Sequence, residues 1–144
     1  MPTRRSSARW EGGLKGGKGT FKGESGAIGG QYSFSSRFEE GVGSNPEELL
    51  AAAEAACYSM ALSGDLEKNG TPSTSVDTEA ACTVSANPGG GFSIKSIALE
   101  VTAVVPGIDD AKFQQIASGT LQNCPVSKTF QGNVELSVNA RLSS

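Results

Sequence analysis

The sequence of 144 residues contains no histidine. This absence excludes Ser-His and Cys-His catalysis and the commonest zinc sites, because all of them depend on an imidazole. Cysteine is scarce: only Cys57, Cys82 and Cys124 occur, far apart and without a C-x-x-C pair. That pattern fits neither a disulfide framework nor a metal cage. We therefore expect no metal and no cofactor, and an enzyme of this composition must work with thiols, carboxylates, Lys, Arg or Tyr.

Long apolar runs and an excess of positive charge are absent too. No stretch approaches the ~20 apolar residues of a membrane span, and the basic start at residues 1–8 is not followed by the apolar segment of a signal peptide. We therefore expect a cytoplasmic protein without a membrane partner. The formal net charge of −3 argues against nucleic-acid binding, which normally needs a basic face. The length fits one domain, residues 1–144.

Glycine, in contrast, is abundant, with 19 residues. Gly and Ser turns divide the first 44 positions into short pieces, and we predict strands at residues 8–11, 18–24 and 32–35. A helix then opens, because Asn45 can cap it, Pro46 suits its first position and Glu48 can return a hydrogen bond to the cap. Residues 49–62 are nearly all apolar or small, which predicts a helix buried in a core. Gly70 is expected to end the helix in a left-handed conformation.

Hydrophobic alternation dominates the second half of the chain. Residues 76–86 alternate with even-numbered side chains inward, residues 88–91 turn, and residues 92–105 return with odd-numbered side chains inward, which predicts a long antiparallel hairpin with one buried face. A second helix is expected from near Asp109, interrupted at residues 123–127, and a last strand at residues 134–142. The order predicts an α+β fold with antiparallel sheets and two main helices, of which the one that carries Cys57 is buried.

The three cysteines differ in their settings. Judged alone, Cys57 among alanines is typical of a small core residue, and Cys82 lies on the inward face of its strand. Cys124 precedes a proline at a helix break, so it can occupy a capping position where backbone N–H groups lower the pKa of a thiol. Glu54 lies three residues before Cys57 on the same helix face. Its carboxylate would raise the pKa of the thiol and so makes a poor activator.

Two further charged residues are candidates for a site. Arg37 lies among aromatic residues, which pin its stem. Glu47 lies in the first turn of the predicted helix, where the dipole favours a carboxylate, so its position fits a simple helix-start preference as well as a functional role.

Several segments resemble the osmotically inducible protein C (OsmC) family and its sister group, the organic hydroperoxide resistance proteins. The two most specific segments are NPEELLAAAEAACYSMAL at residues 45–62 and NCPVS at residues 123–127. Shorter matches follow the family order at residues 10–12, 17–20, 24–26, 36–39 and 105–108, so the resemblance covers nearly the whole chain.

The resemblance implies an OsmC-like fold, an intertwined homodimer with sites at the interface, and a peroxidase acting on small organic hydroperoxides. It implies that Cys57 is the peroxidatic and Cys124 the resolving cysteine, and that Arg37 and Glu47 are catalytic. The sister group takes its arginine from an earlier loop, where this chain has only lysines, which lack the planar guanidinium. A dithiol reductant of the lipoyl-protein type is implied as well.

These roles are physically consistent. A guanidinium at Arg37 favours the thiolate of Cys57, and Glu47 would fix the plane of Arg37 by a bidentate contact. The ten helical residues between Glu47 and Cys57 rise ~15 Å. Either a bent helix or the reach of Arg37 closes that gap within one chain, or Glu47 completes the site of the partner subunit.

Two other functions stay open. One is a non-enzymatic module that binds a lipid-like ligand in an apolar cleft at a dimer interface, with structural cysteines. The other is a different thiol transfer enzyme, which would modify Cys57 without forming a disulfide to Cys124. Peroxide consumption and disulfide mapping distinguish the three.

Overall fold

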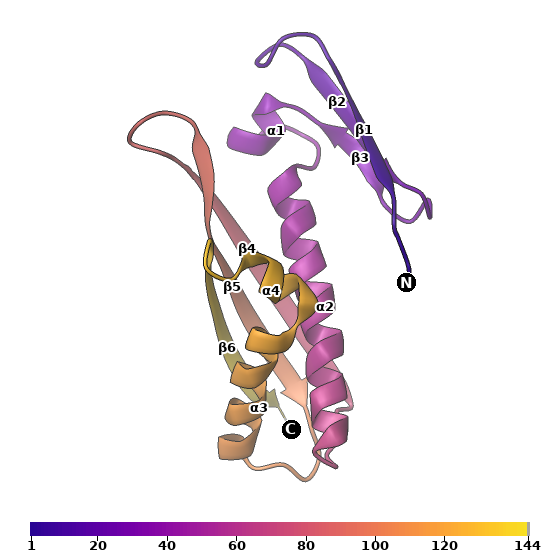
Figure 1. Cartoon of the computed structure of the whole chain (residues 1–144), viewed down its shortest axis with the longest axis vertical. Coiled ribbons are helices and arrows are strands. Elements are labelled where there is room, and N and C mark those ends of the chain that lie inside the picture. Colours follow the sequence, from indigo (N-terminus) through magenta and orange to yellow (C-terminus); the bar gives the residue numbers. More distant parts are fainter. Residues whose placement is uncertain (144) are drawn as a thin grey trace. The chain divides into compact units, whose positions relative to one another are not determined.

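The computed structural model describes residues 1–143 (Figure 1). They fall into two compact units, Met1–Leu49 and a second unit that begins at Leu50. The boundary lies inside one helix, α2 (Pro46–Lys68), so this element belongs to both units. The single domain inferred from the length stays a prediction.

The first unit is a small antiparallel sheet followed by a short helix. The sheet has the strand order β1-β2-β3, and each pair is antiparallel. Gly17 and Gly19 allow close packing there, since a Cβ at Gly19 would lie 2.4 Å from the Tyr32 ring. The elements are β1 (Ser6–Glu11), β2 (Lys18–Gly23), β3 (Gly29–Tyr32) and α1 (Phe34–Phe38).

The third predicted strand is wrong beyond Tyr32, because α1 begins two residues later. Ser33 caps α1 by accepting from the Ser36 N–H at 3.0 Å, and Ser36 Oγ accepts in return from the Ser33 N–H at 2.8 Å. This local capping box outweighs the alternation of Tyr32 and Phe34 that suggested a strand. Helical spacing also brings the rings of Phe34 and Phe38 together, with centroids 5.0 Å apart.

The predicted start and end of α2 are confirmed. The Glu48 N–H donates to Asn45 Oδ1 at 2.8 Å, Pro46 is the first helical residue, and Gly70 has φ +81°. The capping box is incomplete, however. The Glu48 carboxylate accepts from the Ser44 hydroxyl rather than returning a bond to the cap.

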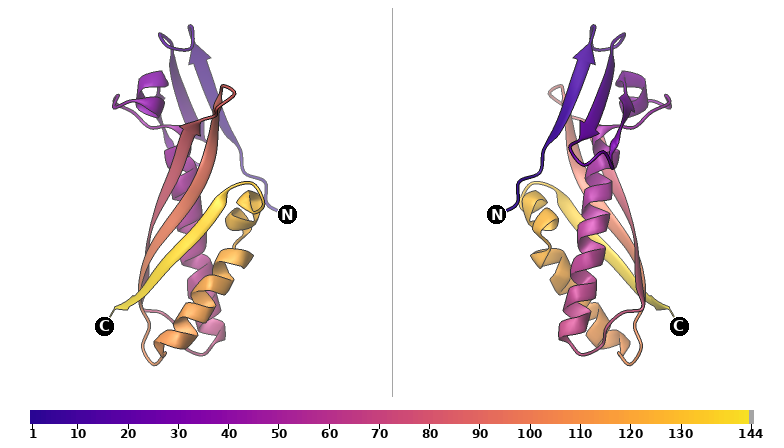
Figure 2. Two further views of the ribbon diagram at one scale, coloured as in Figure 1. Left: turned by 90° about the vertical axis from the view of Figure 1, so that its left-hand side faces the viewer. Right: turned by 90° about the vertical axis from the view of Figure 1, so that its right-hand side faces the viewer.

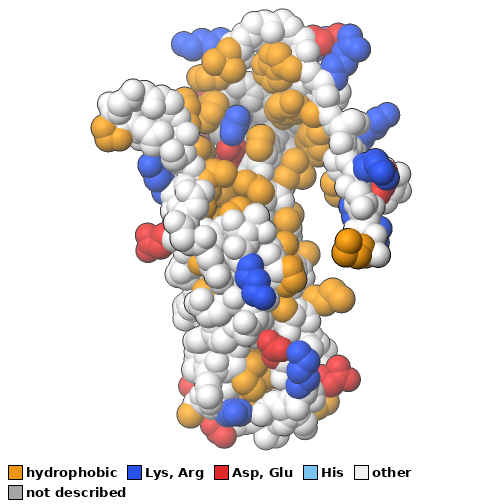
Figure 3. Space-filling view, viewed as in Figure 1, with side chains coloured by type: hydrophobic (Ala, Val, Ile, Leu, Met, Phe, Trp, Pro, Cys, Tyr) orange, Lys and Arg blue, Asp and Glu red, His pale blue; other side chains and the backbone are white. Residues whose placement is uncertain are grey.

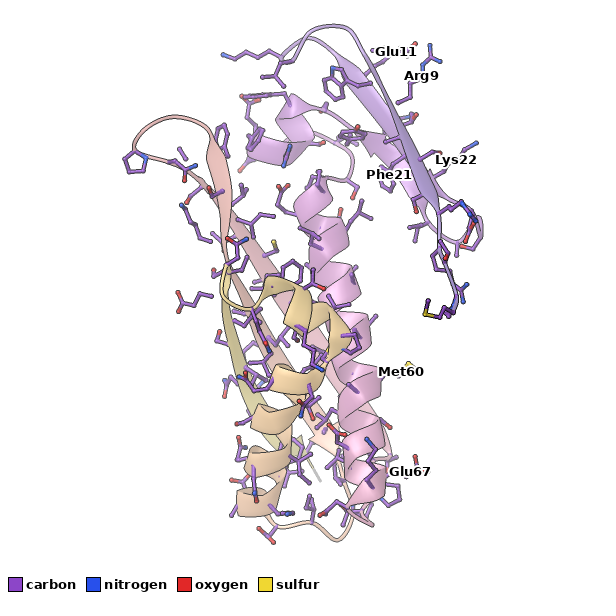
Figure 4. The ribbon with its side chains drawn as sticks, in the orientation of Figure 1. Arg9, Glu11, Phe21, Lys22, Met60 and Glu67 are labelled. Carbon is purple, nitrogen blue, oxygen red and sulfur yellow. The ribbon has the colours of Figure 1, made fainter. Side chains whose placement is uncertain are left out.

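α2 buries one face rather than its whole circumference. Its buried side chains recur every four residues from Glu54, whereas Met60 is 81% exposed and points outward with Glu67 (Figure 4). Apolar side chains therefore reach the visible surface along α2 (Figure 3). The prediction of a helix surrounded by the core is wrong for the single chain, because the alanines that gave the uniform pattern lie on the exposed face: Ala52, Ala53 and Ala56.

The second unit packs helices on one face of a three-stranded sheet (Figure 2). β4 (Ser75–Ala86) and β5 (Phe92–Val104) form the predicted antiparallel hairpin. A register shift between Thr83 and Val84 leaves Ala86 exposed, although the alternation predicted it inward. The core lies between this sheet and the helices and is built from Tyr58, Leu62, Leu66, Ile97, Leu99, Val101, Phe113 and Ala117.

The last strand corrects the expectation of purely antiparallel sheets. β6 (Glu135–Ser143) pairs with β5 in parallel, with Val101 opposite Ala140. Two helices, α3 (Asp110–Asn123) and α4 (Pro125–Phe130), connect these strands. A connection of this length carries the chain back to the end where β5 began, which is the requirement for a parallel neighbour.

Candidate active site

The second unit brings two of the predicted site residues into contact. The sulfurs of Cys57 and Cys124 lie 2.8 Å apart, although the residues are 67 positions apart in the chain. Cys57 lies in the middle of α2 and is partly exposed, whereas Cys124 is 1% exposed. Both are free thiols. Cys82, on β4, packs against the core as predicted.

The backbone fixes Cys124 from both sides. Cys124 is the C-cap of α3, where its N–H donates to the Thr120 carbonyl at 2.9 Å. It is also the N-cap of α4, where its carbonyl accepts from the Lys128 N–H at 2.9 Å. Pro125 forces this break, because it has no N–H to continue α3 but suits the first position of a new helix. The predicted capping position of Cys124 is confirmed.

The surroundings of Cys57 favour its neutral thiol. Burial is the largest influence and raises the pKa of Cys57, and the contact with Cys124 raises this pKa further. The Val126 N–H, in the first turn of α4, acts in the opposite direction, while the negative charge of Glu54 raises the pKa as the sequence predicted. In the described part of the chain, no lysine or arginine is among the groups that shift it.

A second polar contact lies beside the two sulfurs. The Ser127 hydroxyl donates to Glu54 Oε1, and both side chains are 0% exposed. Glu54 Oε2 is buried and has no hydrogen-bond partner among residues 1–143. Sequence reasoning placed Glu54 near Cys57 but missed Ser127. The only available signal was a glutamate four residues before Tyr58, on the stripe of α2 that turned out to be buried.

The other two predicted residues meet in the first unit. Arg37, on α1, donates from Nη2 to Glu47 Oε1 at 2.8 Å and from Nε to Oε2 at 3.2 Å. Glu47 is 5% exposed, so this is a bidentate pair with a largely buried carboxylate. The guanidinium carbon also lies 5.1 Å from the centre of the Phe38 ring. The expected pairing of Arg37 with Glu47 is confirmed, while their catalytic roles stay predictions.

An aromatic cavity adjoins Arg37 within the same unit. It has a volume of about 200 Å³ and is lined by Trp10, Leu14, Tyr32, Ser33, Phe34, Arg37 and Phe38. Four of these side chains are aromatic, so the cavity combines one cation with apolar walls. Such a combination suits a ligand with a hydrocarbon body and one polar end.

Residues 1–143 contain neither a cluster of metal-binding side chains nor a helix that could span a membrane. No group of three or more His, Cys, Asp or Glu side chains among residues 1–143 could hold a metal ion. Within the same range, every helix is too short or too polar to cross a membrane.

Comparisons with known proteins agree on one family. Residues 39–139 match the family model described as OsmC-like protein. The chain is 44% identical over 134 residues to Peroxiredoxin OsmC of Escherichia coli (strain K12), which covers 92% of this chain and 93% of that protein. It is 33% identical over 100 residues to the organic hydroperoxide resistance protein of Xanthomonas axonopodis pv. citri (strain 306), and the match covers 68% of this chain and 67% of that protein. The crystal structure of the organic hydroperoxide resistance protein OhrB of Bacillus subtilis matches with a TM-score of 0.77 and 25% identity, covering 96% of this chain and 98% of that one. The chain therefore belongs to the OsmC-like protein family.

Proposed function

We propose that this chain is a thiol peroxidase that reduces organic hydroperoxides to alcohols through Cys57 and Cys124. The observation that carries the proposal is the 2.8 Å separation of the two sulfurs. Relatives named as a peroxiredoxin and as organic hydroperoxide resistance proteins support a peroxide substrate. A dithiol in contact is what a peroxidase needs to capture its own oxidised cysteine.

The reaction follows from thiol chemistry. The Cys57 thiolate attacks the peroxide O–O bond and takes up one oxygen, and the departing alkoxide gains a proton to become the alcohol. Cys57 is then a sulfenic acid. The Cys124 thiol condenses with it, a disulfide forms and water leaves. An external dithiol, by our proposal of the lipoyl type, reduces the disulfide by exchange and is itself oxidised.

Cys57 needs a cation to become a thiolate, and the groups that shift its pKa include none. We propose Arg37 for this role, because its guanidinium is always charged and Glu47 holds it in one plane. The aromatic cavity beside Arg37 favours a peroxide with a bulky hydrocarbon group over hydrogen peroxide.

We further propose that the active form is a homodimer in which Glu47 and Arg37 serve the Cys57 of the partner subunit. Glu47 and Cys57 of one chain are ten helical residues apart, a rise of about 15 Å along α2. This distance is too long for a guanidinium that is paired with Glu47 to contact the Cys57 thiol of the same chain. The exposed alanines of α2 provide a face of small side chains that a second copy can cover. A two-fold arrangement would then make two equal sites.

The direct test compares the wild type with Cys57→Ser and Cys124→Ser in cumene hydroperoxide consumption with dithiothreitol. The wild type should turn over and Cys57→Ser should be inactive, and Cys124→Ser treated with peroxide in the absence of dithiothreitol should accumulate sulfenic acid. Peptide mapping without reductant should find the disulfide in the wild type after one equivalent of peroxide. No consumption by the wild type would favour the ligand-binding module. Modification of Cys57 without a disulfide would favour a thiol transfer enzyme.

Subunit complementation tests the dimer. Cys57→Ser and Glu47→Ala are co-expressed with different tags, and the mixed dimers are isolated. If Glu47 serves the partner, each mixed dimer has one intact site and one doubly defective site. The isolated mixed dimer should then show about half of the wild-type activity, because one of its two sites is intact. Recovery near zero would place Glu47 and Cys57 of one site in the same chain.

A further inference from the structure

The contact between the sulfurs is one of two adjacent links between α2 and α4. Cys57 meets Cys124, and three residues earlier in α2 Glu54 meets Ser127, three residues later in α4. Side chains three apart share one helix face, so the two links lie next to each other, about 4.5 Å apart along α2. Figure 2 shows α4 beside the middle of α2. The polar link is thus the immediate neighbour of the reacting sulfurs.

The Glu54–Ser127 link stabilises the fold less well than apolar packing at the same place would. Glu54 is fully buried, one of its oxygens has no partner among the described residues, and its charge opposes ionisation of Cys57. A buried polar group without a partner destabilises the fold, whereas replacing both partners by apolar groups can be neutral or better. Unlike apolar packing, however, a hydrogen bond to a carboxylate fixes direction. The link therefore specifies a position at a cost in stability.

We infer that Glu54 and Ser127 are positioning residues, which hold the first turn of α4 against α2 so that Cys124 stays in contact with Cys57. The inference rests on the proposed function, since it deepens the resolving step. When a hydroperoxide has converted Cys57 to the sulfenic acid, Cys124 must attack before a second peroxide does. Attack forms the disulfide and releases water, while a second peroxide gives the irreversible sulfinic acid. The link thus protects Cys57 from inactivation.

A second link of the same chemistry provides a matched control. Asp65, also on α2, accepts from the Thr120 hydroxyl of α3 at 2.8 Å, and Thr120 is 1% exposed. Asp65 lies eight residues beyond Cys57, so this link is about 12 Å along the helix from the sulfurs. Removing either hydroxyl breaks a carboxylate–hydroxyl bond, but only Ser127 should affect the sulfurs.

The first experiment equilibrates the full-length protein with reduced and oxidised glutathione and needs no peroxidase activity. The disulfide forms as oxidised glutathione takes up two electrons and two protons from the cysteines. Ser127→Ala should lower the effective concentration of the two thiols about tenfold, the effect of losing one hydrogen bond to a charged group. Glu54→Gln keeps an acceptor oxygen and should stay within about twofold of the wild type. Thr120→Val should leave the value unchanged.

The double variant Glu54→Met/Ser127→Ala covers the case in which Ser127→Ala alone is poorly folded. It leaves neither partner buried and unpaired, so it should unfold at no lower urea concentration than the wild type, yet show the same tenfold loss. The inference would be overturned if Ser127→Ala or the double variant kept the effective concentration of the wild type. It would also be overturned if Thr120→Val, or Glu54→Gln, lost as much effective concentration as Ser127→Ala.

The second experiment follows the peroxide reaction. After one equivalent of cumene hydroperoxide, dimedone traps sulfenic acid in competition with disulfide closure. The fraction of sulfenic acid that dimedone traps should be about tenfold higher in Ser127→Ala than in the wild type. In Glu54→Gln this fraction should stay close to the wild-type value. Equal trapping in all variants would overturn the positioning role. Absence of any oxidation in the wild type would instead refute the proposed peroxidase, and the glutathione equilibrium would still decide on the link.

Discussion

Oxidation by one equivalent of an organic hydroperoxide should stabilise the fold by joining Cys57 to Cys124. The two residues are 67 positions apart, so the disulfide closes a long loop. In the chain-entropy model, a loop of this length stabilises by about 4 kcal/mol, since the crosslink restricts the unfolded chain. Because the sulfurs already lie 2.8 Å apart, closure moves the backbone little. For a chain of this size the melting temperature should rise about 10 °C or more.

Urea unfolding of the oxidised and reduced protein measures this difference at one fixed protein concentration, because the proposed dimer would unfold in a concentration-dependent way. Cys124→Ser treated with the same peroxide serves as the control and should gain nothing. An equal gain in Cys124→Ser would refute the reasoning, as would no gain in an oxidised wild type whose disulfide has been mapped. A covalent dimer on a non-reducing gel would show that the sulfurs pair between chains instead.

Three further results follow from the contacts of single side chains. Arg37→Lys should lower kcat/KM for cumene hydroperoxide at least about tenfold, because lysine keeps the charge but loses the bidentate contact with Glu47; wild-type activity would remove Arg37 from the site. Glu54→Gln should lower the pKa of Cys57, since it removes a negative charge that raises it, and the alkylation rate should therefore rise at lower pH than in the wild type. Tyr58→Phe should lower the free energy of unfolding by about 1–2 kcal/mol, because the Tyr58 hydroxyl donates to a buried α3 carbonyl. Burial raises the pKa of Tyr58 above that of the unfolded chain, so wild-type stability should fall above pH about 10, and this fall should shrink in Tyr58→Phe.

Elements specified by their own residues could be predicted from the sequence. Asn45 and Pro46 specify the start of α2 locally, and the alternation of apolar side chains specifies the β4–β5 hairpin. The short helix α1 was missed because Ser36 takes the third capping position, where a Glu or Gln is the usual signal. The parallel pairing of β6 depends on where a two-helix connection returns the chain, and no local pattern encodes that.

The candidate site, too, was predictable only where local sequence specifies it. The residue types and the resemblance at residues 36–39, 45–62 and 123–127 allowed Cys57, Cys124, Arg37 and Glu47 to be proposed. The expected pairing of Arg37 with Glu47 is present, whereas the contact between the two sulfurs could not be predicted from the sequence. The Glu54–Ser127 contact joins residues 73 positions apart, and Ser127 reads locally as an ordinary residue of a helix start. Its significance follows only from tertiary packing, which places it opposite a buried carboxylate.

The setting of Cys57 also bears on how the proposed disulfide is reduced. Burial raises the pKa of the Cys57 thiol, and a thiol of high pKa is a poor leaving group in exchange. Moreover, when a monothiol attacks either sulfur, the released cysteine stays in place to expel it and restore the disulfide. A dithiol avoids this reversal, because its own second thiol completes the exchange within the mixed disulfide. A cation that lowers the pKa of Cys57 would assist both its attack on peroxide and its later departure, so loss of Arg37 should slow both halves of the cycle.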